Sequence, residues 1–207
     1  MDAQEGGIVT SSHVTEFARG HQRNPAAYTD FSDDNRHWFR IKRNWESNAA
    51  NDGVCHLMDI KRVKPDENTE ARRLYDAQNN YFYNVLQINV KGGKALVILR
   101  KYQDEQDGAT VYQELIDHYE HKSNKSLIKA KCTEELVGLK LTPKFPVGPK
   151  KFFLQLQNVC LDLENAAEST ISNEVKSGML NAALQDPRFA ATRTSEELLL
   201  TTSKCLP

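Results

Sequence analysis

Apolar residues recur at helical spacing through most of the chain, and short polar or proline-containing segments separate the periodic stretches. One such stretch carries Val111, Tyr112, Leu115 and Tyr119, which fall on one face when the segment is helical. No stretch alternates convincingly between apolar and polar residues with a period of two, the pattern typical of a strand. The sequence therefore predicts an all-α fold.

The first half of the chain is expected to contain three helices. A helix that Ser32 or Asp33 could cap begins near residue 34, a long helix capped by Asn68 or Thr69 follows, and a short helix covers residues 94–101. Three residues at helical offsets define the core-facing side of the first helix: Trp38, Ile41, Trp45.

Composition changes divide the chain into four parts. We expect a disordered arm over 1–30, an N-terminal helical lobe over 31–102, a C-terminal helical lobe over 108–189, and a flexible tail over 190–207, in which residues 195–200 could form a short helix. The polar segment between residues 102 and 108 would then be a short hinge. The side chains expected in the core of the second lobe are Leu115, Tyr119, Leu136, Leu139, Phe153 and Leu156.

The charge balance excludes a globally basic nucleic-acid-binding protein, because 27 basic and 28 acidic side chains leave a net charge of −1. Local basic groups remain candidates for weak contact with RNA, although each is also typical of a solvated helix face. They are Arg40, Lys42, Arg43, Lys61, Arg62 and Lys64.

The four cysteines are widely scattered, which indicates reduced thiols rather than a disulfide framework. The longest apolar run, residues 95–99, is too short to cross a bilayer. Residues 1–7 lack the basic start and apolar stretch of a signal peptide. We therefore expect a cytoplasmic protein without a membrane partner.

Candidate chemistry is sparse. His118 and His121 lie one helical turn apart, but a zinc site needs three or four ligands. The segment Lys91-Gly-Gly-Lys94 lacks the full phosphate-loop pattern, and a break between helices is the simpler interpretation. No Gly-x-Ser-x-Gly elbow is present. We expect no catalytic residues, cofactor, metal or small-molecule substrate, and hence a protein that is not an enzyme.

Several segments, taken in order, resemble the Gag polyprotein of copia-type LTR retrotransposons. The segment from Phe31 to Trp38, followed by Ile41 and Trp45, is similar to the opening pattern of that family. Residues 111–119 resemble its Ala-Trp-x-x-Leu-x-x-x-Tyr helix, with Val-Tyr in place of Ala-Trp.

The resemblance continues towards the C-terminus. Residues 136–141 match the family's Leu-x-x-Leu-x-Leu helix, residues 152–163 correspond loosely to its Phe-rich helix, and residues 180–189 lie where the family has a final helix and its stop. Two departures are the absence of the Cys-Cys-His-Cys knuckle and of the protease that follows Gag. The chain would then be the capsid portion, or a truncated or domesticated Gag.

The resemblance implies a structural capsid protein with two small helical lobes, like a retroviral capsid protein. Such a protein self-associates into virus-like particles that enclose the RNA of the element, so its principal partner is a further copy of itself. Two alternatives remain open. One is a helical adaptor that never assembles, and the other is an RNA-binding module that uses the N-terminal arm and the basic groups.

Overall fold

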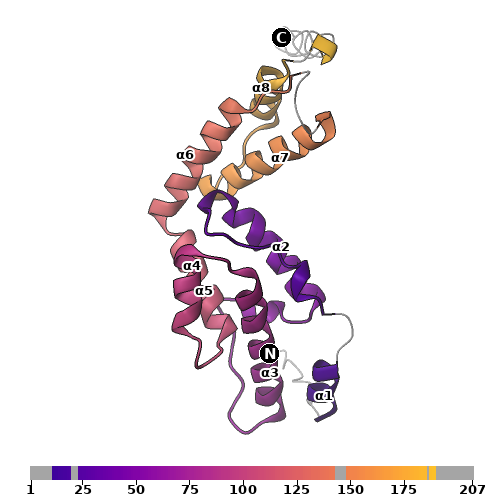
Figure 1. The fold of residues 1–207 in the computed structure, drawn as a ribbon, viewed down its shortest axis with the longest axis vertical. Coiled ribbons are helices and arrows are strands. Elements are labelled where there is room, and N and C mark those ends of the chain that lie inside the picture. Colours follow the sequence, from indigo (N-terminus) through magenta and orange to yellow (C-terminus); the bar gives the residue numbers. More distant parts are fainter. Residues whose placement is uncertain (1–10, 20–22, 143–147, 186, 190–207) are drawn as a thin grey trace, which may run out of the picture. The chain divides into compact units, whose positions relative to one another are not determined.

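The computed structural model describes residues 11–19, 23–142, 148–185 and 187–189. These residues form an all-α structure, as the sequence predicts (Figure 1). The α-helices are α1 (Ser11–Arg19), α2 (Trp38–Asn51), α3 (Glu70–Asn89), α4 (Gly93–Lys101), α5 (Gly108–Tyr119), α6 (Lys122–Gly138), α7 (Gly148–Ala167) and α8 (Asn173–Ala183). Short 3-10 helices are η1 (Pro25–Ala27), η2 (Asn35–His37), η3 (Cys55–Met58) and η4 (Pro187–Phe189).

The chain divides into two compact units after His121, not at the predicted hinge between residues 102 and 108. Helix α5 belongs to the first unit because its N-terminus lies directly against α3. A Cβ atom added at Gly108 would stand 2.4 Å from the backbone nitrogen of Tyr83, so only glycine permits this approach. The predicted lobe boundary is therefore wrong, and the polar segment before α5 is a turn inside the first unit.

The expected disordered arm is also wrong where the structure describes it. Helix α1 packs on α3, and the Phe17 ring meets the Tyr81 ring edge-on with 6.1 Å between centroids. Tyr28 is buried, and its hydroxyl donates a hydrogen bond of 2.9 Å to the Asp52 carboxylate. Sequence periodicity missed this segment because its anchors are single aromatic side chains rather than a repeating stripe.

An aromatic cluster forms the centre of the first unit. Phe31, Trp38, Trp45 and Tyr119 are all fully buried, and their ring centroids lie 4.8–6.4 Å apart in the contacting pairs. The Trp45 indole N–H donates to the Thr29 carbonyl at 2.8 Å, so the buried polar atom has a partner. Burial of Trp38, Ile41 and Trp45 confirms the predicted core of the N-terminal part.

Helix starts follow the capping chemistry of the sequence, with one exception. The Thr69 hydroxyl caps α3 by accepting from the Arg72 N–H, as one of the two predicted alternatives requires. The segment before α2 starts instead as the 3-10 turn η2, and its cap is Asp34 rather than Ser32 or Asp33. Asp33 has a different role, described below.

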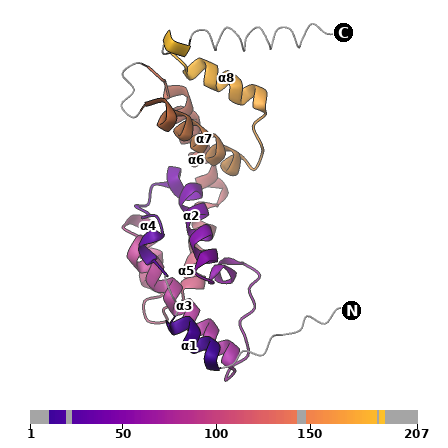
Figure 2. The same cartoon turned by 90° about the vertical axis from the view of Figure 1, so that its right-hand side faces the viewer.

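In the second unit, α6 and α7 run antiparallel. The Gln155 amide donates to Glu135, and Lys125 pairs with Glu168, so the start of one helix lies beside the end of the other. Helix α8 follows α7 (Figure 2). Its end is tied to the segment after α6 by a parallel bridge, in which the Leu141 N–H donates to the Ala183 carbonyl at 2.8 Å.

The predicted core residues of the second lobe are distributed between the two units. Leu115 and Tyr119 are buried, but in the first unit; Leu136, Leu139 and Leu156 are buried in the second. Phe153 is only half-buried, and the neighbouring Phe152 takes the fully buried position. Phe152 shares a stripe with Leu156 at a spacing of four residues, which turns Phe153 about 100° away, towards α8.

Candidate interaction surfaces

The candidate RNA contacts come from two segments, and the first is partly committed to the fold. The Lys42 ammonium forms a 2.6 Å ion pair with Glu120, and the Trp38 indole N–H donates to the same carboxylate at 3.2 Å. Arg40 and Arg43 are half-buried on the same helix, α2. Lys42 therefore joins α2 to the end of α5.

The second basic segment lies between η3 and α3 and is more open. Lys61 and Lys64 are exposed, whereas Arg62 is half-buried and its guanidinium donates to the Asp59 carbonyl at 3.4 Å. The Lys64 ammonium also lies 5.9 Å from the Tyr75 ring centre, within the range of a cation–π contact. Lys61 and Lys64 are thus the candidates that best suit a phosphate contact.

The diglycine segment before α4 is occupied by a side chain of the protein itself. The Asp33 carboxylate accepts from the Lys94 N–H at 3.0 Å and from the Ala95 N–H at 3.2 Å, and so caps α4. Tyr119 donates its hydroxyl to the same carboxylate, and burial together with this bond raises the pKa of Tyr119. A phosphate would have to displace Asp33, which favours the interpretation of Gly92-Gly93 as a helix break.

A polar groove of about 600 Å³ lies between α4 and α5. Its charged side chains largely compensate one another: Lys101 forms a 2.6 Å ion pair with Glu114, and Lys94 and Asp117 add one charge of each sign. Hydrogen bonds from Lys101 and Tyr102 lower the pKa of Glu114. His118 lines this groove, but across the described ranges no cluster of three His, Cys, Asp or Glu side chains could hold a metal ion.

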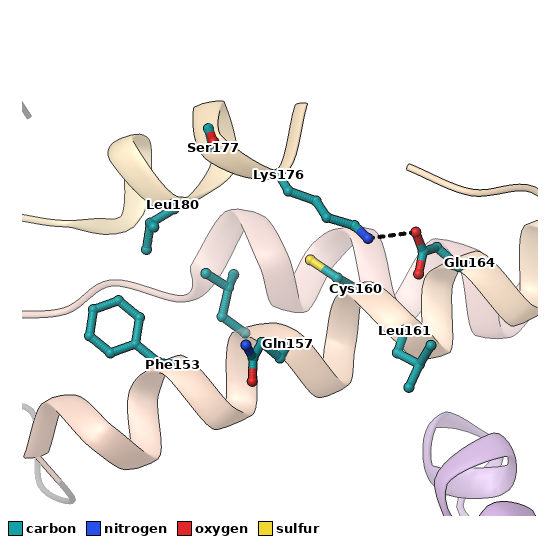
Figure 3. Close-up of a pocket in the computed structure, with 9 residues that line it drawn as sticks. Phe153, Gln157, Cys160, Leu161, Glu164, Lys176, Ser177 and Leu180 are labelled. Carbon is teal, nitrogen blue, oxygen red and sulfur yellow. Dashed lines mark ion pairs between the residues drawn. The ribbon is translucent and has the colours of Figure 1, made fainter. Parts of the chain in front are cut away.

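A more apolar groove of about 420 Å³ separates α7 from α8 (Figure 3). Phe153 and Cys160 project from α7 towards α8, and Leu180 projects back from α8. Burial raises the pKa of the Cys160 thiol and so favours its neutral form. At one end, Lys176 of α8 pairs with Glu164 of α7 at 2.8 Å.

Helix α6 carries apolar side chains on two faces. One face, formed by Ile128, Cys132 and Leu136, is buried. The other presents Leu127, Ala130 and Val137 at offsets of three and ten residues, and all three are exposed, Leu127 by 44% and Val137 by 70%. We call these three residues the outer stripe. The sequence contained its signal, because a single packed face does not account for apolar residues on both sides of α6.

Comparison with known protein families, curated proteins and solved structures finds no match to this chain. Within the described residues, no helix is both long and apolar enough to span a bilayer.

Proposed function

We propose that this protein is a self-assembling structural protein, a capsid (Gag) protein of the copia-type retrotransposon class that its sequence resembles, and that it is not an enzyme. Its copies would assemble into particles that enclose the RNA of the element, in the cytoplasm. The observation that carries the proposal is the outer stripe of α6. A helix already packed on one side by α7 gains nothing from exposed leucine and valine on its other side unless a further surface covers them.

Three further features support assembly. Each unit has its own buried core, so each can present a surface without help from the other. The net charge of −1 leaves little long-range repulsion between copies. Individually weak contacts suffice in a closed shell, because many of them act together.

The proposal is tested by electron microscopy and light scattering across a series of protein and salt concentrations. We expect closed particles or tubes from the parent chain and their loss in the double variant Leu127→Glu/Val137→Glu. The matched control is Ser126→Glu/Thr133→Glu, which adds two carboxylates to another exposed face of α6 and should still assemble. A parent chain that stays monomeric throughout, with and without RNA, would favour an adaptor that uses the outer stripe for another protein.

RNA contact is a secondary proposal, favoured by the exposure of Lys61 and Lys64. Phosphate contacts release counterions, so affinity should fall as salt rises, with a slope set by the number of contacts. We expect Lys61→Gln/Lys64→Gln to reduce that slope by about two in a titration with single-stranded RNA. An unchanged slope would remove this segment from the interface.

A further inference from the structure

The groove between α7 and α8 is incompletely filled from within. Ala183 is the only residue of α8 that is fully buried, whereas Val175 is 49% exposed and Leu180 is half-buried. Helix α8 therefore lies against α7 mainly through its ends. Its start is held by the Lys176–Glu164 ion pair, and its end by the backbone bridge between Leu141 and Leu184.

The two ends of the groove differ. At the Glu164 end, the carboxylate binds Lys176 and also accepts from the Ile171 N–H at 2.8 Å, so the α7–α8 connection closes the groove. At the other end stands Phe153, whose ring meets the Phe189 ring edge-on with 6.4 Å between centroids. The chain thus leaves α8 and returns to the open end of the groove before residue 190.

The sequence that follows Phe189 has the composition to fill the groove. Between residues 190 and 207 the longest apolar run is Leu198-Leu199-Leu200, preceded by the polar segment 192–197. These residues lie outside the part of the chain that the structure describes. The groove wall is itself mainly apolar, with Phe153, Leu156 and Leu180 facing the space.

The distance is within reach. Nine residues separate Phe189 from Leu198, a span of about 13 Å in helical form or at most about 30 Å when extended. The groove floor between Phe153 and Cys160 is about 10 Å long, at 1.5 Å per helical residue. The leucine run can therefore lie over the groove in either conformation.

We propose that the α7/α8 groove binds the chain's own segment Leu198–Leu200, which covers Phe153, Cys160 and Leu180 as an intramolecular strap. The short connection favours this occupant over a separate molecule, because a tethered segment has an effective concentration in the millimolar range. The inference is independent of assembly, since it concerns the second unit alone. It also makes the strap, rather than the helix bundle, the element that decides whether this apolar surface is open.

The test uses the Cys160 thiol, which lines the groove, as a reporter of occupancy. In a full-length Cys55→Ser/Cys205→Ser background, the rate of alkylation of Cys160 by iodoacetamide is followed by mass spectrometry. We expect Leu198→Glu/Leu199→Glu/Leu200→Glu to accelerate it at least five-fold. The matched control, Thr201→Glu/Thr202→Glu/Ser203→Glu, adds the same charge next to the leucines and should leave the rate unchanged.

Cys132, buried in α6, is the internal standard. If it accelerates together with Cys160, the leucines hold the core of the second unit rather than the groove, and the proposal is wrong. An unchanged Cys160 rate in the leucine variant overturns it directly. A rate in the parent background that rises on ten-fold dilution assigns the groove to a second copy and likewise overturns the intramolecular strap.

Addition of the missing segment in trans gives a second, independent measurement. A synthetic peptide of residues 190–204, at millimolar concentration, should restore slow alkylation of Cys160 to the leucine variant. The same peptide with the three leucines replaced by glutamate should not. Equal effects of the two peptides would contradict recognition of the leucine run.

Discussion

The Trp38 indole ring stacks on the Tyr119 phenol ring, with 4.8 Å between centroids and 24° between the planes. Trp38 begins α2 and Tyr119 ends α5, so this contact joins two helices far apart in the sequence. Offset stacking of this kind contributes about 0.5–1.5 kcal/mol beyond the burial of the rings. Both side chains are fully buried, which places the contact at the centre of the first unit.

We expect Trp38→Ala to lower the free energy of unfolding of the first unit by about 3–5 kcal/mol, because it removes a large buried ring and leaves a cavity. The only other tryptophan, Trp45, also belongs to this unit. Its fluorescence in a denaturant titration therefore reports on the first unit alone. Val97→Ala, at a position 57% exposed, is the control and should shift the midpoint little. Unchanged unfolding of Trp38→Ala would refute the core assignment.

Asp33 combines an unusual backbone with three accepted hydrogen bonds, and three variants separate the two contributions. Its φ of 71° is strained for most residues, but Asn and Gly tolerate it. We expect a loss of about 2–4 kcal/mol for Asp33→Ala, which loses the helix cap, leaves the Tyr119 hydroxyl unpartnered and strains the backbone. Asp33→Gly should lose less, and Asp33→Asn least. Parent-like stability of Asp33→Gly in urea titrations would show that the hydrogen bonds contribute little.

Gly108→Ala should destabilise the first unit, because the new Cβ would lie 2.4 Å from Tyr83 N and 3.0 Å from the Asn79 carbonyl oxygen. Neither backbone atom can move without shifting α3. Gly178→Ala, with no atom within 4 Å of its Cβ, should instead stabilise α8 by up to about 1 kcal/mol. Thermal unfolding monitored by circular dichroism distinguishes the two. A shift in the same direction for both variants would contradict the close approach of α5 to α3.

Asp107 should make the first unit sensitive to acid. Burial alone would raise its pKa, but hydrogen bonds from the Thr110 N–H, the Asn79 amide and the Thr110 hydroxyl outweigh burial and lower the pKa below 3.8. A lowered pKa stabilises the folded state above the unfolded value, and this stabilisation is lost as pH falls through the folded-state value. Asp107→Asn should therefore cost more stability at about pH 5 than at about pH 2.

Tryptophan-monitored urea titrations at the two pH values measure this difference. Glu105→Gln, an exposed carboxylate in the same turn, is the control and should show no such dependence. An equal cost of Asp107→Asn at both pH values would mean that its hydrogen bonds do not depend on the charge.

The sequence predicts the helices well because their periodicity is local. The tryptophan stripe, the Thr69 cap and the start of α4 at the diglycine all follow from spacing and capping chemistry. The division between units was not predictable in the same way. The polar segment before Gly108 has the composition of a hinge, yet the missing side chain of Gly108 allows α5 to pack on α3, and composition does not report that contact.

The candidate surfaces show a similar limit. Apolar spacing alone exchanged Phe152 for Phe153, because adjacent apolar residues both fit a helical stripe within one turn. The role of Asp33 could not be seen from its neighbours, since its partners lie at Lys94, Ala95 and Tyr119. A side chain that bridges distant elements leaves no periodic trace.

The Asp33–Tyr119 hydrogen bond also constrains how the protein is made. The first unit is complete only when Tyr119, almost its last residue, meets a carboxylate near its start. A nascent chain must therefore expose the unfinished aromatic cluster until α5 has emerged from the ribosome, and at 5–20 residues per second that takes several seconds. During synthesis the first unit is thus more exposed to chaperones and to misassembly than its finished core suggests.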